Sequence, residues 1–127
     1  MNIDKNARYA VSHEYALKSG DEIITGISDH AQSALGDIVF VELPAVGKTL
    51  KKGETFGVIE SVKAASDVYM PMGGTITEVN GALEGDPALV NREPHAGGWL
   101  IKFKPADPAE FDALLDAAAY EVEAAKE

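Results

Sequence analysis

The chain of 127 residues contains no cysteine. Disulfide bonds, thiolate nucleophiles and cysteine-ligated metal centres are therefore excluded. If the protein takes part in redox chemistry, the reacting sulfur has to come from a bound cofactor. Two further shortages, of long apolar segments and of basic charge, narrow the classes of function that remain.

No apolar run approaches the roughly 20 residues that a membrane-spanning helix needs. Residues 1–10 hold no apolar stretch typical of a signal peptide, and they are too short and acidic for an organelle transit sequence, so we predict a cytoplasmic protein. Basic residues are scarce, with 11 lysines and arginines against 21 aspartates and glutamates and a formal charge of −10. This balance argues against nucleic-acid and anionic-membrane partners and suits docking onto proteins with basic rims.

What the sequence does contain is a series of strand signals separated by glycine and proline. Apolar residues make up 46% of the chain and no low-complexity linker divides it, which predicts one domain over residues 1–127. Strand-like runs occur at residues 38–43, 55–60, 67–70, 75–79 and 99–103. In the last run we expect Trp99, Ile101 and Phe103 to alternate onto one buried face. Many short strands of this kind predict a mainly β sandwich or barrel.

Two helices are predicted. Residues 29–36 begin with Asp29 as a cap and end at Gly36. A second helix is expected from Asp107, which is followed by Pro at the first helical position and Glu three residues after the cap. Apolar residues recur at helical spacing in this helix, which predicts one stripe that packs on the sheet. The stripe consists of Phe111, Leu114, Leu115, Ala118 and Val122.

Residues 57–71 place a lysine between two predicted strands. Lys63 lies near the middle of the connection, and the tip of such a hairpin protrudes from the core. The lysine amine can be acylated there without disturbing the packing, and its small neighbours leave room for an attaching enzyme. The chain has nine lysines, however, and most surface lysines serve solubility alone, so the position by itself is weak support for a special role.

Patterns of independent enzymes are absent, since no GxSxG, HExxH or P-loop pattern occurs. The three histidines, at positions 13, 30 and 95, are far apart in the sequence. We interpret each as a surface or packing residue and predict no metal site. Acid–base work by His13 with Glu14 would require activity of the isolated protein. We therefore predict no catalytic residues and a chain that is not itself an enzyme.

The segment Glu60-Ser61-Val62-Lys63-Ala64 resembles the lipoylation site of the glycine cleavage H proteins. The resemblance extends from about residue 9 to residue 121, and Tyr15, where the family usually has Trp, keeps an aromatic body with a polar tip. Further blocks resemble the family in the same order, at residues 12–14, 26–32, 35–44, 80–83, 87–91, 98–102 and 114–117 with Tyr120. An ordered series of blocks is far more specific than the lysine motif alone.

This resemblance implies a flattened β-sandwich of the lipoyl and biotinyl carrier type, a barrel-sandwich hybrid, with short helices near residue 30 and at the C-terminus. It implies lipoate bound covalently to the amine of Lys63. The expected neighbours of the attachment point are Glu60, Ser61, Val62, Ala64 and Asp67. Glu14 is expected to hold the amine of the loaded arm, with Ser12 and Asp67 beside it.

The resemblance also implies a set of partners. In the family, the arm receives an aminomethyl group at glycine decarboxylase and passes the one-carbon unit to tetrahydrofolate at the aminomethyltransferase, with release of ammonia. Dihydrolipoyl dehydrogenase then reoxidises the dithiol, and lipoate-attaching enzymes load the carrier in the first place. The expected protein is a monomeric shuttle, which supplies reach while cofactors supply the chemistry.

Other carriers resemble this chain less. Lipoyl domains of 2-oxoacid dehydrogenases usually have Asp directly before the modified lysine, where this chain has Val62. Biotin carriers usually have Met on both sides of the lysine, where this chain has Val62 and Ala64. Two alternatives stay open on the sequence. The protein can be a relay that donates its lipoyl group to other enzymes, or an interaction module whose Lys63 stays unmodified.

Overall fold

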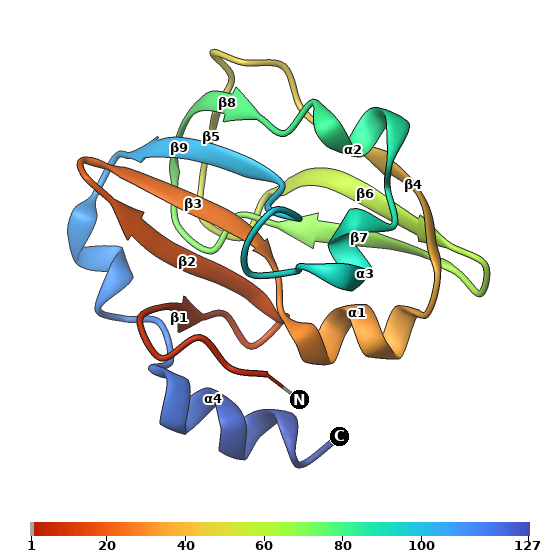
Figure 1. Cartoon of the computed structure of the whole chain (residues 1–127). Helices are drawn as coiled ribbons and strands as arrows, with labels where there is room; N and C mark the ends of the chain where they lie inside the picture. The colour runs from red at the N-terminus through yellow and green to blue at the C-terminus, as the bar shows by residue number, and fades with distance from the viewer. Residues whose placement is uncertain (1) are drawn as a thin grey trace.

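Two antiparallel sheets form the frame of the protein in a computed structural model, which describes residues 2–127 (Figure 1). The larger sheet has six strands in the order β1 (Arg8–Tyr9), β2 (Glu14–Ser19), β3 (Glu22–Ile27), β9 (Ile101–Pro105), β8 (Gly74–Val79) and β5 (Thr49–Leu50). The smaller sheet has three strands in the order β4 (Ile38–Glu42), β6 (Thr55–Ser61) and β7 (Ala65–Tyr69). The frame is therefore mainly β, as the sequence predicts.

Short helices lie around the sheets. They are α1 (Asp29–Leu35), α2 (Ala82–Gly85), α3 (Leu89–Arg92), the 3₁₀-helix η1 (Pro108–Phe111) and α4 (Ala117–Ala124). In Figure 1, α1 runs below the smaller sheet and α4 lies beside β1 at the lower end of the molecule. In the part of the chain that the structure describes, no helix is long and apolar enough to cross a membrane.

The core divides into a large and a small cluster. The large cluster fills the space between the sheets, and Ile59, Ile101 and Phe103 in it are fully buried. The small cluster joins the ends of the chain and consists of Ala7, Tyr9, Tyr15, Tyr120 and Ala124. In it the rings of Tyr9 and Tyr120 stack with centroids 4.2 Å apart, which fastens α4 to β1.

The predicted strands are confirmed with boundary shifts of one or two residues, but two details of the last strand are wrong. Trp99 precedes β9 and is partly exposed, and the Lys102 ammonium lies 4.9 Å from its ring centroid. Leu100, which the alternation would expose, is fully buried. The backbone before β9 is irregular, because the Asn80 amide donates hydrogen bonds to the carbonyls of Gly97 and Trp99, so the period of two does not apply there.

The expected short helices near residue 30 and at the C-terminus are confirmed as α1 and α4, but the predicted single stripe of the C-terminal helix is wrong. Gly36 ends α1 as predicted, but the cap is Ser28, whose hydroxyl accepts a hydrogen bond from the Ala31 amide. The segment from Asp107 forms only the turn of η1. It is then interrupted by an antiparallel bridge between Leu115 and Tyr9, after which α4 starts again at a second cap. Val122 is consequently 61% exposed, so the predicted single stripe does not exist.

Candidate functional site

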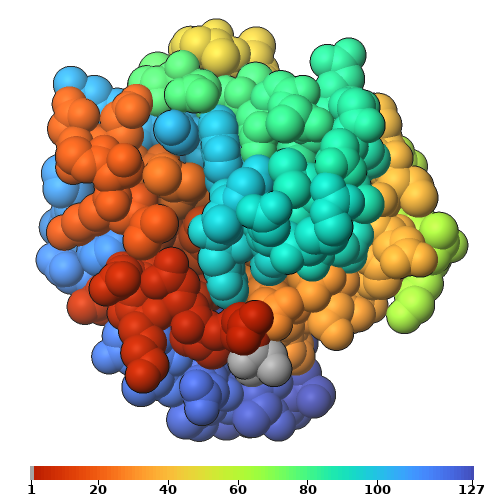
Figure 2. All heavy atoms as spheres, in the orientation of Figure 1, coloured from red at the N-terminus to blue at the C-terminus, as the bar shows by residue number. Residues whose placement is uncertain are grey.

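Lys63 lies at the end of the β6–β7 hairpin and is exposed. The Ser61 side chain organises this turn, since its hydroxyl oxygen accepts hydrogen bonds of 3.2 Å from the amides of Lys63 and Ala64. The Ser61 amide in turn donates to the Ala64 carbonyl at 2.8 Å. Figure 2 shows the hairpin end at the right-hand edge of the molecule, where an external protein can reach it.

The hairpin end is fixed to the connection between α1 and β4. The Val62 amide donates a hydrogen bond of 3.0 Å to the Asp37 carbonyl. The stem of Lys63 passes over Gly36, where an added Cβ would lie 3.3 Å from the lysine Cε. Gly36 also has a φ of +80°, so the backbone at this position favours glycine, and the Lys63 stem packs closely against it.

Asn91 holds the same connection from α3 and is not among the site residues predicted from the sequence. Its amide nitrogen donates to the Gly36 carbonyl and to the Gln32 side chain, each at 2.9 Å. Its side-chain oxygen accepts from the Ile38 amide at 2.9 Å. Asn91 is therefore a positioning residue for the surface on which Lys63 rests. An asparagine in a short helix gives no sequence signal for such a role.

A cleft of about 180 Å³ lies between α1, β7 and the turn that precedes β2. Its lining residues are Ser12, His13, Glu14, Ile27, His30, Ala31, Ala34, Leu35, Ser66, Asp67, Val68 and Glu127. Three predicted site residues, Ser12, Glu14 and Asp67, are thus brought together around one space. Asp67 on β7 follows Lys63 by four residues. A chain of that length spans at most about 14 Å when extended, so the lysine is close to the cleft wall.

Glu14 is a buried carboxylate in this cleft, with only 2% of its surface exposed. One carboxylate oxygen accepts a hydrogen bond from the Ser12 hydroxyl, and the other accepts one of 3.0 Å from the Tyr69 amide. Burial raises the pKa of Glu14 above its ordinary value, while these two hydrogen bonds act in the opposite direction. A carboxylate held in this way is suited to receive a cationic group that enters the cleft.

The remaining predicted residues flank the tip without entering the cleft. Glu60 is exposed on β6, where it pairs with Phe40 and Ala65 on its two neighbouring strands. Val62 is 67% exposed, and on β4 Val39 and Phe40 are 54% and 51% exposed. The hairpin end therefore combines acidic and apolar surface, a composition suited to a protein partner.

The histidines are arranged differently from the sequence prediction. His95 packs edge-on against Tyr15, with ring centroids 5.3 Å apart, and burial lowers its pKa, so the interpretation as a packing residue is confirmed. His13 and His30, in contrast, lie with ring centroids 4.8 Å apart at the edge of the cleft. Their separation in sequence concealed this contact.

Comparison with known proteins identifies the family of this chain. The family model described as glycine cleavage H-protein matches residues 7–127. The chain belongs to the glycine cleavage H-protein family. A glycine cleavage system H protein of Thermus thermophilus is 52% identical over 121 residues, which cover 95% of this chain and 94% of that protein. That of Chromohalobacter salexigens is 56% identical over 121 residues, covering 94% of this chain and 92% of the relative.

A solved structure also confirms the predicted fold. The crystal structure of a glycine cleavage system H protein from Mycobacterium marinum superposes with a TM-score of 0.87 at 38% sequence identity. The match covers 95% of this chain and 98% of that chain. The H-protein fold thus extends over nearly all of the chain. Both the hairpin that presents Lys63 and the cleft around Glu14 are built from elements of this fold.

Proposed function

We propose that the protein is the lipoyl carrier of a glycine cleavage system and that Lys63 is its attachment point. Membership of the H-protein family carries the first part of this proposal. The second part is supported by the exposed amine of Lys63 at an accessible hairpin end. A bound lipoyl group would supply the sulfur chemistry that a chain without cysteine lacks.

The residues around Lys63 fit a long acyl arm. Attachment joins the lysine nitrogen to the carboxyl carbon of an activated lipoate by an amide, with loss of the activating group and one proton. The lysine stem already rests on Gly36, and small or short side chains at Ser61, Ala64 and Ser66 leave the approach open. The cleft behind β7 offers a place where the free end of an arm is shielded from water.

Within the cleft, we assign Glu14 to hold a cationic group carried at the end of the arm, with Ser12 orienting the carboxylate and Asp67 at the rim. The Ser12 hydroxyl and the Tyr69 amide fix both oxygens of Glu14, so the carboxylate is already oriented before a cation arrives. The protein thereby contributes reach, protection and charge rather than a catalytic step of its own. This division of roles is that of a carrier component.

The surface around the hairpin end is the proposed docking face for the partners, which are glycine decarboxylase, aminomethyltransferase, dihydrolipoyl dehydrogenase and the lipoate-attaching enzymes. Exposed Glu60 and Asp67 add negative charge beside the exposed apolar residues Val62 and Phe40. Affinity for these partners is therefore expected to fall as salt is added. Binding that is independent of salt would contradict the acidic part of this docking face.

The decisive experiment is intact-mass measurement with peptide mapping after expression with lipoate and its attachment enzymes. We expect a mass gain of one lipoyl group, located on Lys63 and abolished by Lys63→Arg. Lys52→Arg is the matched control, because Lys52 is also an exposed lysine in a turn and should leave the gain unchanged. Absence of any gain would favour an unmodified interaction module. A gain on another lysine would overturn the assignment of Lys63.

Loaded protein then separates the two carrier roles. Transfer activity with the purified glycine cleavage enzymes is expected from a shuttle, whereas transfer of the lipoyl group itself to another acceptor protein is expected from a relay. Glu14→Gln should keep the mass gain at Lys63, because Glu14 lies in the cleft and not at the turn. The same variant should lower transfer activity, and unchanged transfer would remove Glu14 from the proposed site.

A further inference from the structure

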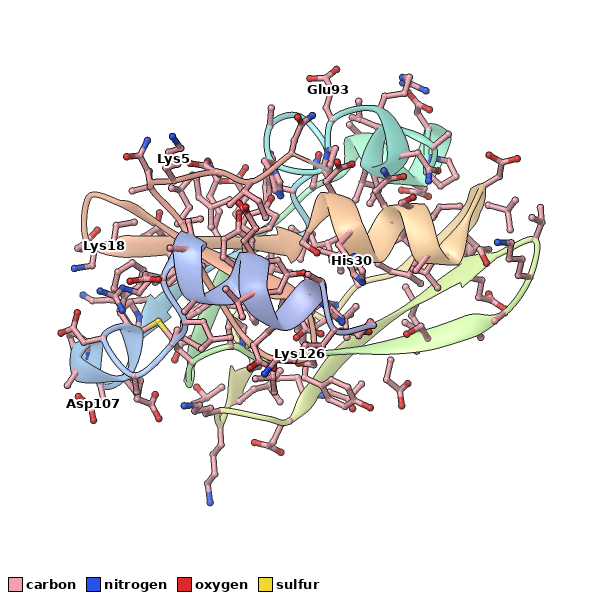
Figure 3. All side chains as sticks on the ribbon, turned by 90° about the horizontal axis from the view of Figure 1, so that it is seen from below. Lys5, Lys18, His30, Glu93, Asp107 and Lys126 are labelled. Carbon is pink, nitrogen blue, oxygen red and sulfur yellow. The ribbon has the colours of Figure 1, made fainter. Side chains whose placement is uncertain are left out.

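Three side chains with metal-binding atoms meet at the edge of the cleft, and neither the family assignment nor the proposed carrier function uses them as a group. His13 precedes β2, His30 lies on α1, and Glu127 follows α4. One ligand atom from each lies within 4.8 Å of the others. Figure 3 shows His30 between α1 and the end of α4, where segments from both ends of the sequence converge.

The three groups point their ligand atoms at one another. The Nε2 atom of His13 lies 2.7 Å from one carboxylate oxygen of Glu127, and the Nε2 atom of His30 lies 3.8 Å from the other. The two imidazole rings are tilted by 34° with centroids 4.8 Å apart. In a tetrahedral site with metal–ligand bonds of about 2.0–2.1 Å, ligand atoms lie about 3.3 Å apart. Small side-chain movements are therefore sufficient to place all three around one ion.

His13 is held in the orientation that a ligand needs. Its Nδ1 atom shares a hydrogen bond of 2.7 Å with the Tyr120 hydroxyl, which itself lies 2.6 Å from the Ser28 hydroxyl. The ring is thus fixed through the nitrogen that faces the protein, and Nε2 is left toward the cleft, as in metal-binding histidines supported by a second hydrogen bond. The backbone is constrained as well, because the His13 carbonyl accepts from the Ser28 amide at 2.9 Å.

The backbone conformation of His13 is unusual as well. Among residues 2–127, His13 is the only residue other than glycine with a positive φ, at +82°. This conformation is unfavourable for a side chain that carries a Cβ, and such residues gather at functional sites. The fold therefore accepts backbone strain at the position that directs this imidazole toward His30 and Glu127.

We propose that His13, His30 and Glu127 bind one divalent transition-metal ion of the zinc class. Two imidazole nitrogens and one carboxylate oxygen are a donor set that zinc prefers, whereas magnesium and calcium prefer oxygen ligands alone. Three protein ligands leave a fourth position for water or another donor. Because Glu127 follows α4, the ion joins the C-terminal segment to α1 and to the turn before β2 at the rim of the cleft.

The test is a calorimetric titration of zinc chloride into untagged protein of residues 1–127 that has first been treated with a chelator and dialysed. We expect one zinc ion per chain and a rise in melting temperature, because an ion that binds only the folded chain stabilises it. Glu127→Gln should weaken binding at least tenfold, the lower end of the roughly 10–100-fold cost of losing a supporting group at a metal site. Glu127 lies outside the core and its side chain is 53% exposed, so we expect this substitution to leave folding undisturbed.

Two controls make the result specific. Glu123→Gln removes an exposed carboxylate of the same C-terminal segment, which pairs with Lys126 and not with the histidines, and should bind zinc like the unaltered protein. Lys63→Arg should also bind zinc normally, so failure of the carrier assignment and failure of the metal site are distinguishable. His30→Gln should lower the affinity as Glu127→Gln does. No saturable binding, or equal binding by all four variants, would overturn the site.

Discussion

The hairpin end that presents Lys63 and the cleft wall around His13 and Glu14 are built in opposite ways. At the hairpin end the side chains are exposed, and backbone and Ser61 hydrogen bonds fix the turn. At the cleft wall Glu14 is buried, and His13 is connected through the Tyr120 hydroxyl to Ser28. Substitutions should therefore lower the unfolding free energy little at the hairpin end and much more at the cleft wall.

The contrast matches what each region is proposed to do. An attachment point has to enter the active site of a modifying enzyme, which requires exposed backbone and small neighbours. A binding cleft has to present fixed polar groups, which requires side chains locked by hydrogen bonds and packing. The two regions meet at β7, which begins beside the hairpin end and lines the cleft, and substitutions in each region measure how independent they are.

The largest effect is expected for Tyr120→Ala. Tyr120 is fully buried, stacks on Tyr9 and bonds both His13 and Ser28, so its removal opens a cavity and releases α4. We expect a loss of about 3–5 kcal/mol in the free energy of unfolding, measured by urea denaturation at pH 7. Tyr120→Phe keeps the stack and should lose about 1 kcal/mol. Equal losses for the two variants would show that the hydroxyl, and not the packing, fastens α4.

Gly36→Ala should have the next largest effect and connects the two regions. The alanine Cβ would contact the Lys63 stem, and a φ of +80° is strained for any residue with a Cβ, so we expect a loss of about 1–3 kcal/mol. Gly81→Ala is the matched control. Gly81 has a φ of −62° and open space around its Cβ position, so alanine there should gain about 0.4–1 kcal/mol. Effects of the same sign at both positions would contradict this account of Gly36.

Glu14→Gln should change the pH dependence of stability. Burial raises the folded-state pKa of Glu14 above its value of 4.5 in the unfolded chain. Between these two values the folded protein binds more protons than the unfolded chain, so this group lowers stability as pH rises, by at most about 1.4 kcal/mol per pH unit. As pH rises through this window, the unfolding free energy of the unaltered protein should therefore fall relative to that of Glu14→Gln. Parallel curves from pH 4 to pH 8 would refute the shift.

The sequence predicts the strands from residue 38 onward better than the hairpin of β2 and β3 that precedes them. Runs such as residues 38–43 and 55–60 are rich in β-branched residues, and their strands form within one residue of the expected bounds. β2 and β3 are not among the strands predicted from the sequence, although they form a regular hairpin. Glu14 and Thr25 are polar yet buried in these strands, so the polar and apolar alternation that marks a strand is broken in both, and Glu14 is the one that lines the cleft.

The candidate site likewise contains residues that the sequence predicts and residues that it does not. Lys63 and its neighbours form one continuous segment, so a resemblance in sequence was sufficient to propose them. The cluster of His13, His30 and Glu127 comes from three segments and depends on how α4 folds back onto β1, which no local pattern specifies. Asn91 acts through hydrogen bonds to backbone that is distant in sequence, and its role is visible only in three dimensions.

The smallest effect is expected for Lys63→Arg, which tests the independence of the two regions directly. Lys63 is exposed and contributes only its stem to Gly36, which arginine can replace, so the unfolding free energy should change by less than about 0.5 kcal/mol while lipoyl attachment is lost. Combined with Tyr120→Phe, the two changes should add to within about 0.3–0.5 kcal/mol, because the residues share no contact. The double-mutant cycle is measured by urea denaturation. A larger coupling energy would mean that the hairpin end and the cleft wall are energetically coupled, so that modification of Lys63 would change the stability of the structure around His13.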